Sequence, residues 1–101
     1  MRGEVYRLPA RGRGHEQRGR RCAVVVQPDW LNLSTWIVAF TSTSARETSF
    51  RPVVTIGNER TLVMCDQLAT VDLSRLTERA GFLTLDEMQV VDEALSLVLD
   101  L

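Results

Sequence analysis

Two segments of the chain contain the residue types best suited to chemistry. An arginine-rich segment contains Glu16 and ends at Arg21, and a β-prone segment ends in four consecutive hydroxyl side chains, Thr41 to Ser44. Arginine presents a fork of N–H donors to phosphate oxygens, a hydroxyl can donate a further hydrogen bond, and a carboxylate can accept a proton. Together these groups indicate chemistry at a phosphate.

The residue patterns of the common hydrolases are absent from the sequence. It contains one histidine, His15, and lacks a Gly-x-Ser-x-Gly elbow, a Walker phosphate loop and a cluster with metal-ligand spacing. RNA can be cleaved by its own 2′-hydroxyl while a protein only moves protons and stabilises charge on the phosphorane. We therefore expect no metal and no cofactor, and we do not expect His15 to act in catalysis.

Charge is distributed unevenly along the 101 residues. Residues 1–21 contain seven arginines and two glutamates, whereas residues 85–101 contain five acidic side chains and no basic one. The N-terminal part is therefore expected to attract phosphate. Length and the 45% apolar composition predict one domain, residues 1–101, whose thin core would gain from dimerisation.

The apolar segments are short. None approaches the roughly 20 residues needed to cross a bilayer, and the opening MRGEVYRL lacks the apolar stretch of a signal peptide. Cys22 and Cys65 lie beside apolar residues, as is typical of small buried thiols in a reducing compartment. We therefore expect a cytoplasmic protein without a membrane partner.

Alternating and β-branched segments predict the strands. They lie at 3–8, 21–27, 35–43, 50–56, at one or two places within 61–73, and at 79–82. Gly57-Asn58 is a turn dipeptide, and residues 9–19 contain three glycines and a proline, which predicts a mobile basic loop.

The C-terminal segment has the period of a helix. Thr84 and Glu87 form a capping-box pair, and an apolar stripe follows at Leu85, Met88, Val91, Leu95, Val98 and Leu99. We expect this stripe to pack in the core. The elements together predict a β-rich α+β fold, a small open β-barrel with a C-terminal helix packed on it.

Four segments resemble the MazF/PemK family in the family's order. HEQRGRRCAVVV at 15–26 is similar to the pattern S-E-Q-x-G-x-R-P-A-V-V, and VAFTST at 38–43 to the strand that ends in a catalytic threonine. CDQLATVDLSRL at 65–76 resembles the D-Q segment, and RGEVY at 2–6 the opening R-G-[DE]-[IV]-[WY]. The resemblance covers nearly the whole chain.

The resemblance implies a fold, an activity and partners. The fold is an SH3-like β-barrel with a terminal helix, as in the CcdB, Kid and MazF toxins. The implied activity is sequence-selective cleavage of single-stranded mRNA to 2′,3′-cyclic phosphate and 5′-hydroxyl ends, which inhibits translation and growth as the toxin of a type II toxin–antitoxin system. The implied partners are a second copy in a homodimer and a MazE-like antitoxin.

Residue by residue, the resemblance implies a site. Arg21 matches the catalytic arginine, Thr41 the catalytic threonine and Glu16 a loop glutamate that can act as base. RNA contacts are expected from Gln17 and Gln67 by the same match, and from the neighbouring basic and hydroxyl groups Arg18, Arg20 and Ser42. The chain departs from the pattern at Cys22, where the family has proline, and at Ala69, where it has a basic residue.

Other interpretations are open at this stage. A toxin on the same barrel can poison a protein such as DNA gyrase, and a basic domain can bind RNA without cutting it. The set Glu16, Arg21 and Thr41 favours cleavage, because gyrase-directed relatives lack it as a set. Trp30 and Trp36 can stack on bases or pack as structural residues, and we favour packing.

Overall fold

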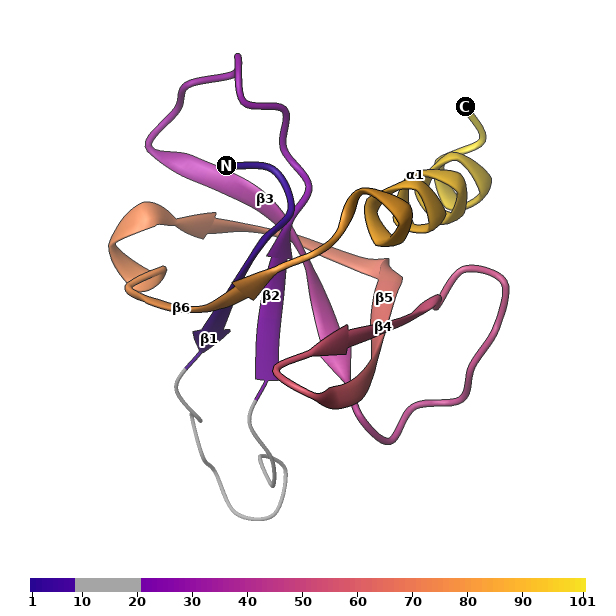
Figure 1. The fold of residues 1–101 in the computed structure, drawn as a ribbon. Coiled ribbons are helices and arrows are strands. Elements are labelled where there is room, and N and C mark those ends of the chain that lie inside the picture. Colours follow the sequence, from indigo (N-terminus) through magenta and orange to yellow (C-terminus); the bar gives the residue numbers. More distant parts are fainter. Residues whose placement is uncertain (9–20) are drawn as a thin grey trace, which may run out of the picture.

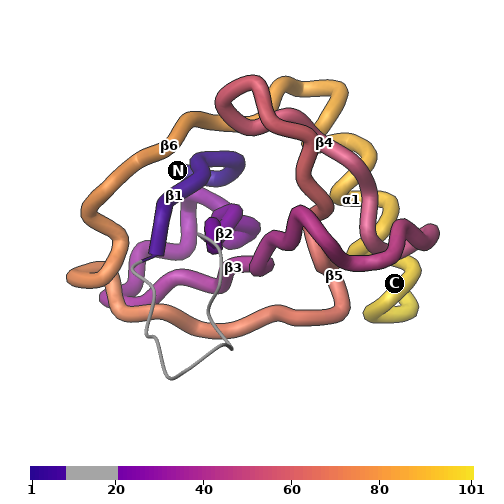
Figure 2. The backbone as a smooth tube through the Cα atoms, turned by 90° about the horizontal axis from the view of Figure 1, so that it is seen from below, coloured from indigo at the N-terminus to yellow at the C-terminus, as the bar shows by residue number. Residues whose placement is uncertain are grey.

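Six strands form one antiparallel sheet that curves into an open barrel (Figure 1). The computed structural model describes residues 1–8 and 21–101. The elements in chain order are β1 (Glu4–Leu8), β2 (Arg21–Val25), β3 (Thr35–Ser42), β4 (Val53–Ile56), β5 (Glu59–Asp72), a 3-10 turn (Leu73–Arg75), β6 (Glu78–Phe82) and α1 (Leu85–Leu99). The strand order is β4-β5-β3-β2-β1-β6, and the view from below in Figure 2 shows the edge strands β4 and β6 turning toward each other. The predicted fold class is confirmed.

Two strands differ from the sequence-based expectation. β5 is one strand of 14 residues, because no glycine or proline interrupts residues 59–72. It bends instead where its pairing with β3 shifts register, between Ala39 and Thr41. β4 begins at Val53 and is shorter than expected, because Pro52 has no N–H to donate to the ladder, although the Pro52 and Phe50 carbonyls still accept from β5.

The sheet has a packed core on each face. The helix-side core lies between the strands and α1, and the opposite core lies under the second half of β5 and the 3-10 turn. The helix-side core contains Val5, Val24, Val26, Ala39, Val54, Val63, Cys65, Leu83, Val91, Ala94 and Leu95. The opposite core contains Leu8, Ala23, Val25, Val38, Val71 and Leu76, with Tyr6, Trp36, Phe40 and Leu73 packed against it. Successive residues of a strand therefore belong to different cores.

Helix α1 begins as expected. The Glu87 N–H donates to Thr84 Oγ1 at 3.1 Å, and the Thr84 N–H donates to Glu87 Oε1 at 2.9 Å, which completes the capping box. Glu87 Oε2 also accepts the Thr55 N–H at 2.9 Å, so the same carboxylate joins the helix start to β4.

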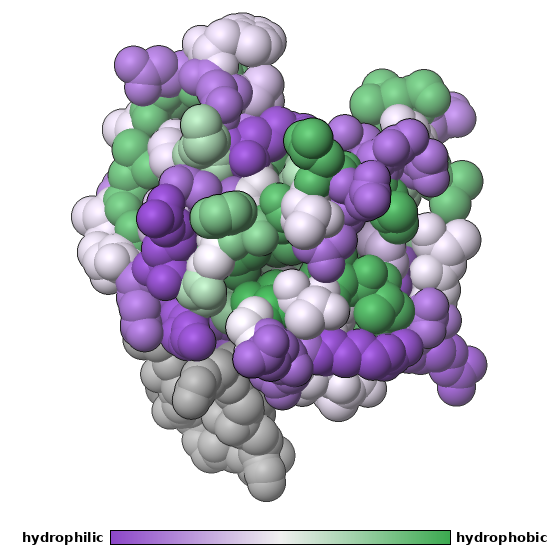
Figure 3. Space-filling view, in the orientation of Figure 1, coloured by the Kyte–Doolittle hydropathy of each residue, from purple (hydrophilic) through white to green (hydrophobic). Residues whose placement is uncertain are grey.

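The prediction that the whole apolar stripe is core was wrong at the two ends of α1. Val91 and Leu95 are buried, but Leu85 is 89% exposed and Leu99 is 50% exposed. The helix rests on the sheet through its middle turns, so its ends extend past the strands. Figure 3 shows apolar side chains at the surface near the C-terminal end of the chain.

The two tryptophans differ. Trp36 packs against the opposite core, as expected for a structural residue, whereas Trp30 is 80% exposed and is not packed within one copy of the chain.

Both cysteines lie in strands. Cys65 is buried, and this burial raises the pKa of its thiol to about 11. In the described part of the chain, no helix is long and apolar enough to span a membrane.

Candidate functional site

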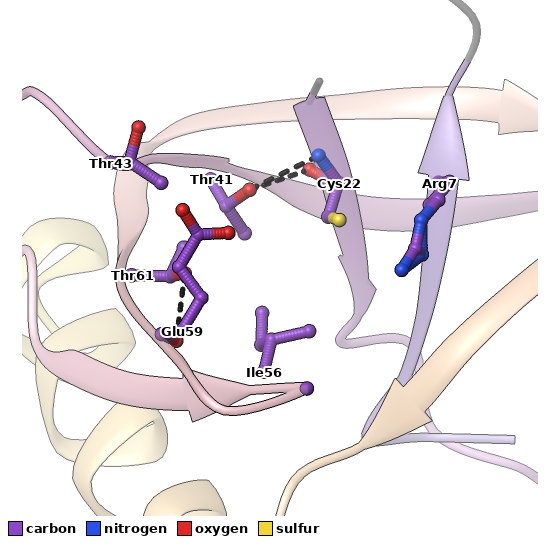
Figure 4. Close-up of a pocket in the computed structure, with 8 residues that line it drawn as sticks. Arg7, Cys22, Thr41, Thr43, Ile56, Glu59 and Thr61 are labelled. Atoms are coloured by element: carbon purple, nitrogen blue, oxygen red, sulfur yellow. Dashed lines mark hydrogen bonds between the residues drawn. The ribbon is translucent and has the colours of Figure 1, made fainter. Parts of the chain in front are cut away.

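A cavity of about 310 Å³ lies at one end of the barrel, where the β4–β5 hairpin faces β1, β2 and β3. Its walls are mainly polar, and Figure 4 shows side chains from both sides directed into it. The lining residues are Arg7, Cys22, Thr41, Thr43, Ile56, Gly57, Glu59 and Thr61. We call this the Thr41 pocket.

Thr41 is held in this pocket by the peptide of Cys22. The Cys22 N–H donates to Thr41 Oγ1 at 3.1 Å, and Thr41 Oγ1 donates to the Cys22 carbonyl at 3.2 Å (Figure 4). Thr41 is only 4% exposed. A proline at position 22 could not make the first of these bonds, since it has no N–H. The departure from the family pattern therefore adds a hydrogen bond to the threonine expected to act on RNA.

Arg21 lies on the other face of the same strands. Its guanidinium carbon is 4.6 Å from the centroid of the Phe40 ring, and Phe40 packs against the opposite core. Cys22, the next residue, packs against the helix-side core. The structure therefore does not place the Arg21 and Thr41 side chains in one pocket, although both lie where β2 begins and β3 ends.

Ser42 and Gln67 do not line the Thr41 pocket. Ser42 Oγ accepts the N–H groups of Ser44 and Ala45, at 3.1 and 2.9 Å, and so fixes the turn after β3. Gln67 is exposed on β5, near the register shift. Glu16, Gln17, Arg18 and Arg20 lie outside the described residues.

Asp66, beside Gln67, pairs with Arg51. Arg51 Nε and Nη2 donate to the two carboxylate oxygens of Asp66 at 3.0 and 2.8 Å. The two residues are 15 positions apart in the sequence. The Arg51 hydrogen bonds lower the pKa of the Asp66 carboxyl. The Cys65 N–H donates to the Phe50 carbonyl at 3.2 Å. This hydrogen bond and the Arg51–Asp66 ion pair fix the segment between β3 and β4 against β5.

The sequence model for PemK-like, MazF-like toxins of type II toxin–antitoxin systems matches residues 1–99. The chain belongs to this family. A candidate toxin of Mycobacterium tuberculosis (strain ATCC 25618 / H37Rv) is 38% identical over 104 residues, which cover 100% of this chain and 98% of the relative. The resemblance in the four motifs is thus confirmed as family membership.

Solved structures share the fold of this PemK/MazF-like toxin. A mycobacterial endoribonuclease in complex with its cognate antitoxin superposes with a TM-score of 0.81 at 18% identity, over 100% of this chain and 95% of that one. MazF from Deinococcus radiodurans gives 0.74 at 24% identity, over 98% and 94% of the two chains.

Two of the described residues that line the toxin's pocket are charged and were not singled out from the sequence. Arg7 lies two positions after Val5 on β1, so both side chains point to the helix-side face of the sheet. A charged side chain on this otherwise apolar face indicates that the core is open there, and Arg7 lines the pocket. That alternation was available in the sequence. Glu59 reaches the pocket only because the β4–β5 hairpin folds over the end of the barrel, which no local pattern predicts.

Proposed function

We propose that this toxin is an endoribonuclease that cleaves single-stranded mRNA at selected sequences and thereby stops translation and growth. The observation that carries the proposal is the Thr41 hydroxyl, held in a polar pocket of about 310 Å³ beside the strand end that contains Arg21. Family membership supports it, and a structural neighbour is an endoribonuclease bound to its antitoxin. Messenger RNA as the substrate places the reaction in the cytoplasm.

The reaction uses a nucleophile that belongs to the substrate. The 2′-oxygen attacks the adjacent phosphorus, the bond from phosphorus to the 5′-oxygen breaks, and the products are a 2′,3′-cyclic phosphate and a 5′-hydroxyl. One proton leaves the 2′-hydroxyl and one reaches the departing 5′-oxygen. A guanidinium supplies permanent positive charge for the phosphorane, so the chemistry requires no metal ion.

Arg21 and Thr41 divide this work in the proposal. Arg21 leaves the Phe40 ring and either gives the proton to the departing 5′-oxygen or stabilises charge on the phosphate. Thr41 turns its hydroxyl from the Cys22 carbonyl to a phosphate oxygen. The scissile phosphate then crosses the ends of β2 and β3, between the two faces of the sheet. Glu16 accepts the proton of the 2′-hydroxyl.

The remaining expected RNA contacts belong to the same proposal. Arg18 and Arg20 bind neighbouring phosphates, Gln17 and Gln67 contact bases, and Ser42 binds at the strand end. The basic residues contribute sequence-independent affinity, and the amides contribute base selection.

Two protein partners complete the proposal. The apolar surface around the end of α1 continues into a groove lined by Ile37, Leu68, Leu95 and Leu99, which a second copy or an antitoxin segment can cover. A homodimer and a MazE-like antitoxin fit this surface.

Cleavage in EDTA tests the function. Purified protein is incubated with a long single-stranded RNA, and the new ends are sequenced after selective capture of 5′-hydroxyls. We expect discrete cuts at a short motif, 2′,3′-cyclic phosphate on the upstream products, and no effect of EDTA. Intact RNA at high protein concentration, or cleavage that needs added metal, would contradict the proposal.

A further inference from the structure

Among the described residues that line the Thr41 pocket, the cation is Arg7, and Arg21 lies on the opposite face. Arg7 is paired in register with Cys22 across β1 and β2, and the Cys22 peptide is hydrogen-bonded to Thr41 on β3. Arg7, Cys22 and Thr41 thus form a row across three adjacent strands, on one face of the sheet. Side chains that face each other on adjacent strands are about 5 Å apart at their Cβ atoms. The guanidinium of Arg7 can therefore reach a group bound to the Thr41 hydroxyl.

The contacts of Arg7 leave it able to bind a ligand. Its ion pair is long, with 3.9 Å between Nε and Glu78 Oε2, and the Glu78 side chain is 70% exposed. Such a pair contributes little to stability. The Arg7 side chain is itself 37% exposed, and Figure 4 shows it on the wall of the pocket that faces the β4–β5 hairpin. An arginine at a pocket wall with one long ion pair is suited to an incoming anion.

We propose that Arg7 is a phosphate-binding residue of this toxin, which holds an RNA phosphate in the Thr41 pocket. This proposal rests on the function proposed above and adds a contact that the motifs do not predict. The guanidinium offers two donors to two phosphate oxygens, while the hydroxyl of Thr41 offers a single bond from β3.

Glu59 defines which side of the pocket the phosphate occupies. Its carboxylate enters from the β4–β5 hairpin and points toward Thr43 and Thr41 in Figure 4, and Thr61 Oγ1 donates to its carbonyl at 3.2 Å. A phosphate next to Glu59 would meet a like charge. The phosphate therefore lies on the β1–β2 side, beside Arg7, and the sugar or base extends toward the hairpin.

Arg7→Gln tests the contact, with Arg79→Gln as the matched control. Arg79 lies on β6, next to β1, but pairs with Glu4 at 2.9 Å and is 55% exposed, so its loss removes the same charge outside the pocket. The probe is a mixed-sequence 2′-O-methyl RNA oligonucleotide, which cannot be cut through a 2′-hydroxyl. Binding is measured as a function of salt, and cleavage is measured in parallel on unmodified RNA.

We expect Arg7→Gln to weaken oligonucleotide binding about tenfold. The slope of log K against log salt should fall by about 0.7, the value for one phosphate contact on a single strand. Arg79→Gln should change affinity less than about twofold. Equal losses in the two variants, unchanged binding in Arg7→Gln, or no binding by the wild type would overturn the proposal.

The parallel readouts separate this proposal from the ribonuclease proposal. If the wild type cleaves RNA but Arg7→Gln binds the oligonucleotide as well as the wild type does, the role of Arg7 is refuted and the ribonuclease proposal stands. Arg7-dependent binding without any cleavage removes the activity and leaves the phosphate site. If Arg7→Gln does not fold, NMR of the wild type replaces it. The Arg7 Nε–H resonance is then assigned as the guanidinium signal that is missing from the spectrum of Arg7→Lys. That resonance should shift when the oligonucleotide is added, and a fixed resonance would overturn the proposal.

Discussion

The two faces of the sheet differ at the point where β2 begins and β3 ends. On one face Thr41, Cys22 and Arg7 surround an open polar pocket, and on the other face Arg21 stacks on Phe40. Arg21 and Cys22 are consecutive, so strand alternation alone separates the two catalytic candidates. In the proposed function, Arg21 and Thr41 therefore act on a phosphate around a strand end rather than within one cavity, and Arg7 is the cation on the Thr41 side.

The largest expected effect is on the Arg21 face. Arg21→Ala should reduce cleavage on the order of 100-fold or more, because it removes a charge-matched donor to the phosphorane. Phe40→Leu should change cleavage no more than about threefold, since it removes the stacking on the ring and keeps an apolar side chain against the opposite core. The measurement is single-turnover cleavage with saturating protein. If Phe40→Leu is as inactive as Arg21→Ala, the stacked position is itself the active one.

On the Thr41 face, Thr41→Val should reduce cleavage and stability together. The variant leaves the Cys22 N–H without its hydroxyl acceptor, which should cost about 1–2 kcal/mol in urea unfolding. Cleavage should fall on the order of 100-fold, far more than the loss of folded protein explains. Thr41→Ser keeps the hydroxyl and should restore most of both. A cleavage loss that only follows the folded fraction would assign Thr41 a structural role.

The sequence could predict the strands and the start of the helix, but not how the side chains around the pocket are arranged. Alternation gave β1, β2 and β3, and Thr84 with Glu87 gave the helix start, because these patterns are local. The pairing of Asp66 with Arg51, the entry of Glu59 into the pocket and the exposure of Leu99 depend on how the barrel closes and where α1 rests on it. Arg21 and Thr41 came from a motif, which names residues without stating which face they occupy.

A smaller effect is expected from the hydrogen bond that Cys22 adds. Cys22→Pro removes the N–H that orients Thr41 Oγ1 toward the carbonyl, so the hydroxyl should turn to substrate more easily. Since a hydrogen bond contributes about 1 kcal/mol, single-turnover cleavage should rise by up to about fivefold while stability falls by about 1 kcal/mol. Cys22→Ala retains the peptide and should cleave like the wild type. Equal changes in both variants would assign the effect to the thiol.

The smallest expected effect concerns the segment between β3 and β4, which borders the Thr41 face. Asp66→Asn removes the ionised partner of Arg51, so urea unfolding at neutral pH should show a slightly lower midpoint than in the wild type. The Arg51 bonds lower the folded-state pKa of Asp66 below its unfolded value. The stabilisation is therefore fully present above the unfolded value of about 3.9 and is lost as pH falls through the lower folded pKa.

Urea unfolding at acidic pH shows whether Asp66 stabilises the protein through its charge. If the pair acts through charge, the wild type and Asp66→Asn should approach the same midpoint as the pH falls below the folded pKa of Asp66. A constant difference at every pH would mean that Asp66 acts by packing. If cleavage of RNA falls in Asp66→Asn while the midpoint is unchanged, the segment after β3 shapes the Thr41 pocket directly, and the Thr41 face extends to Asp66.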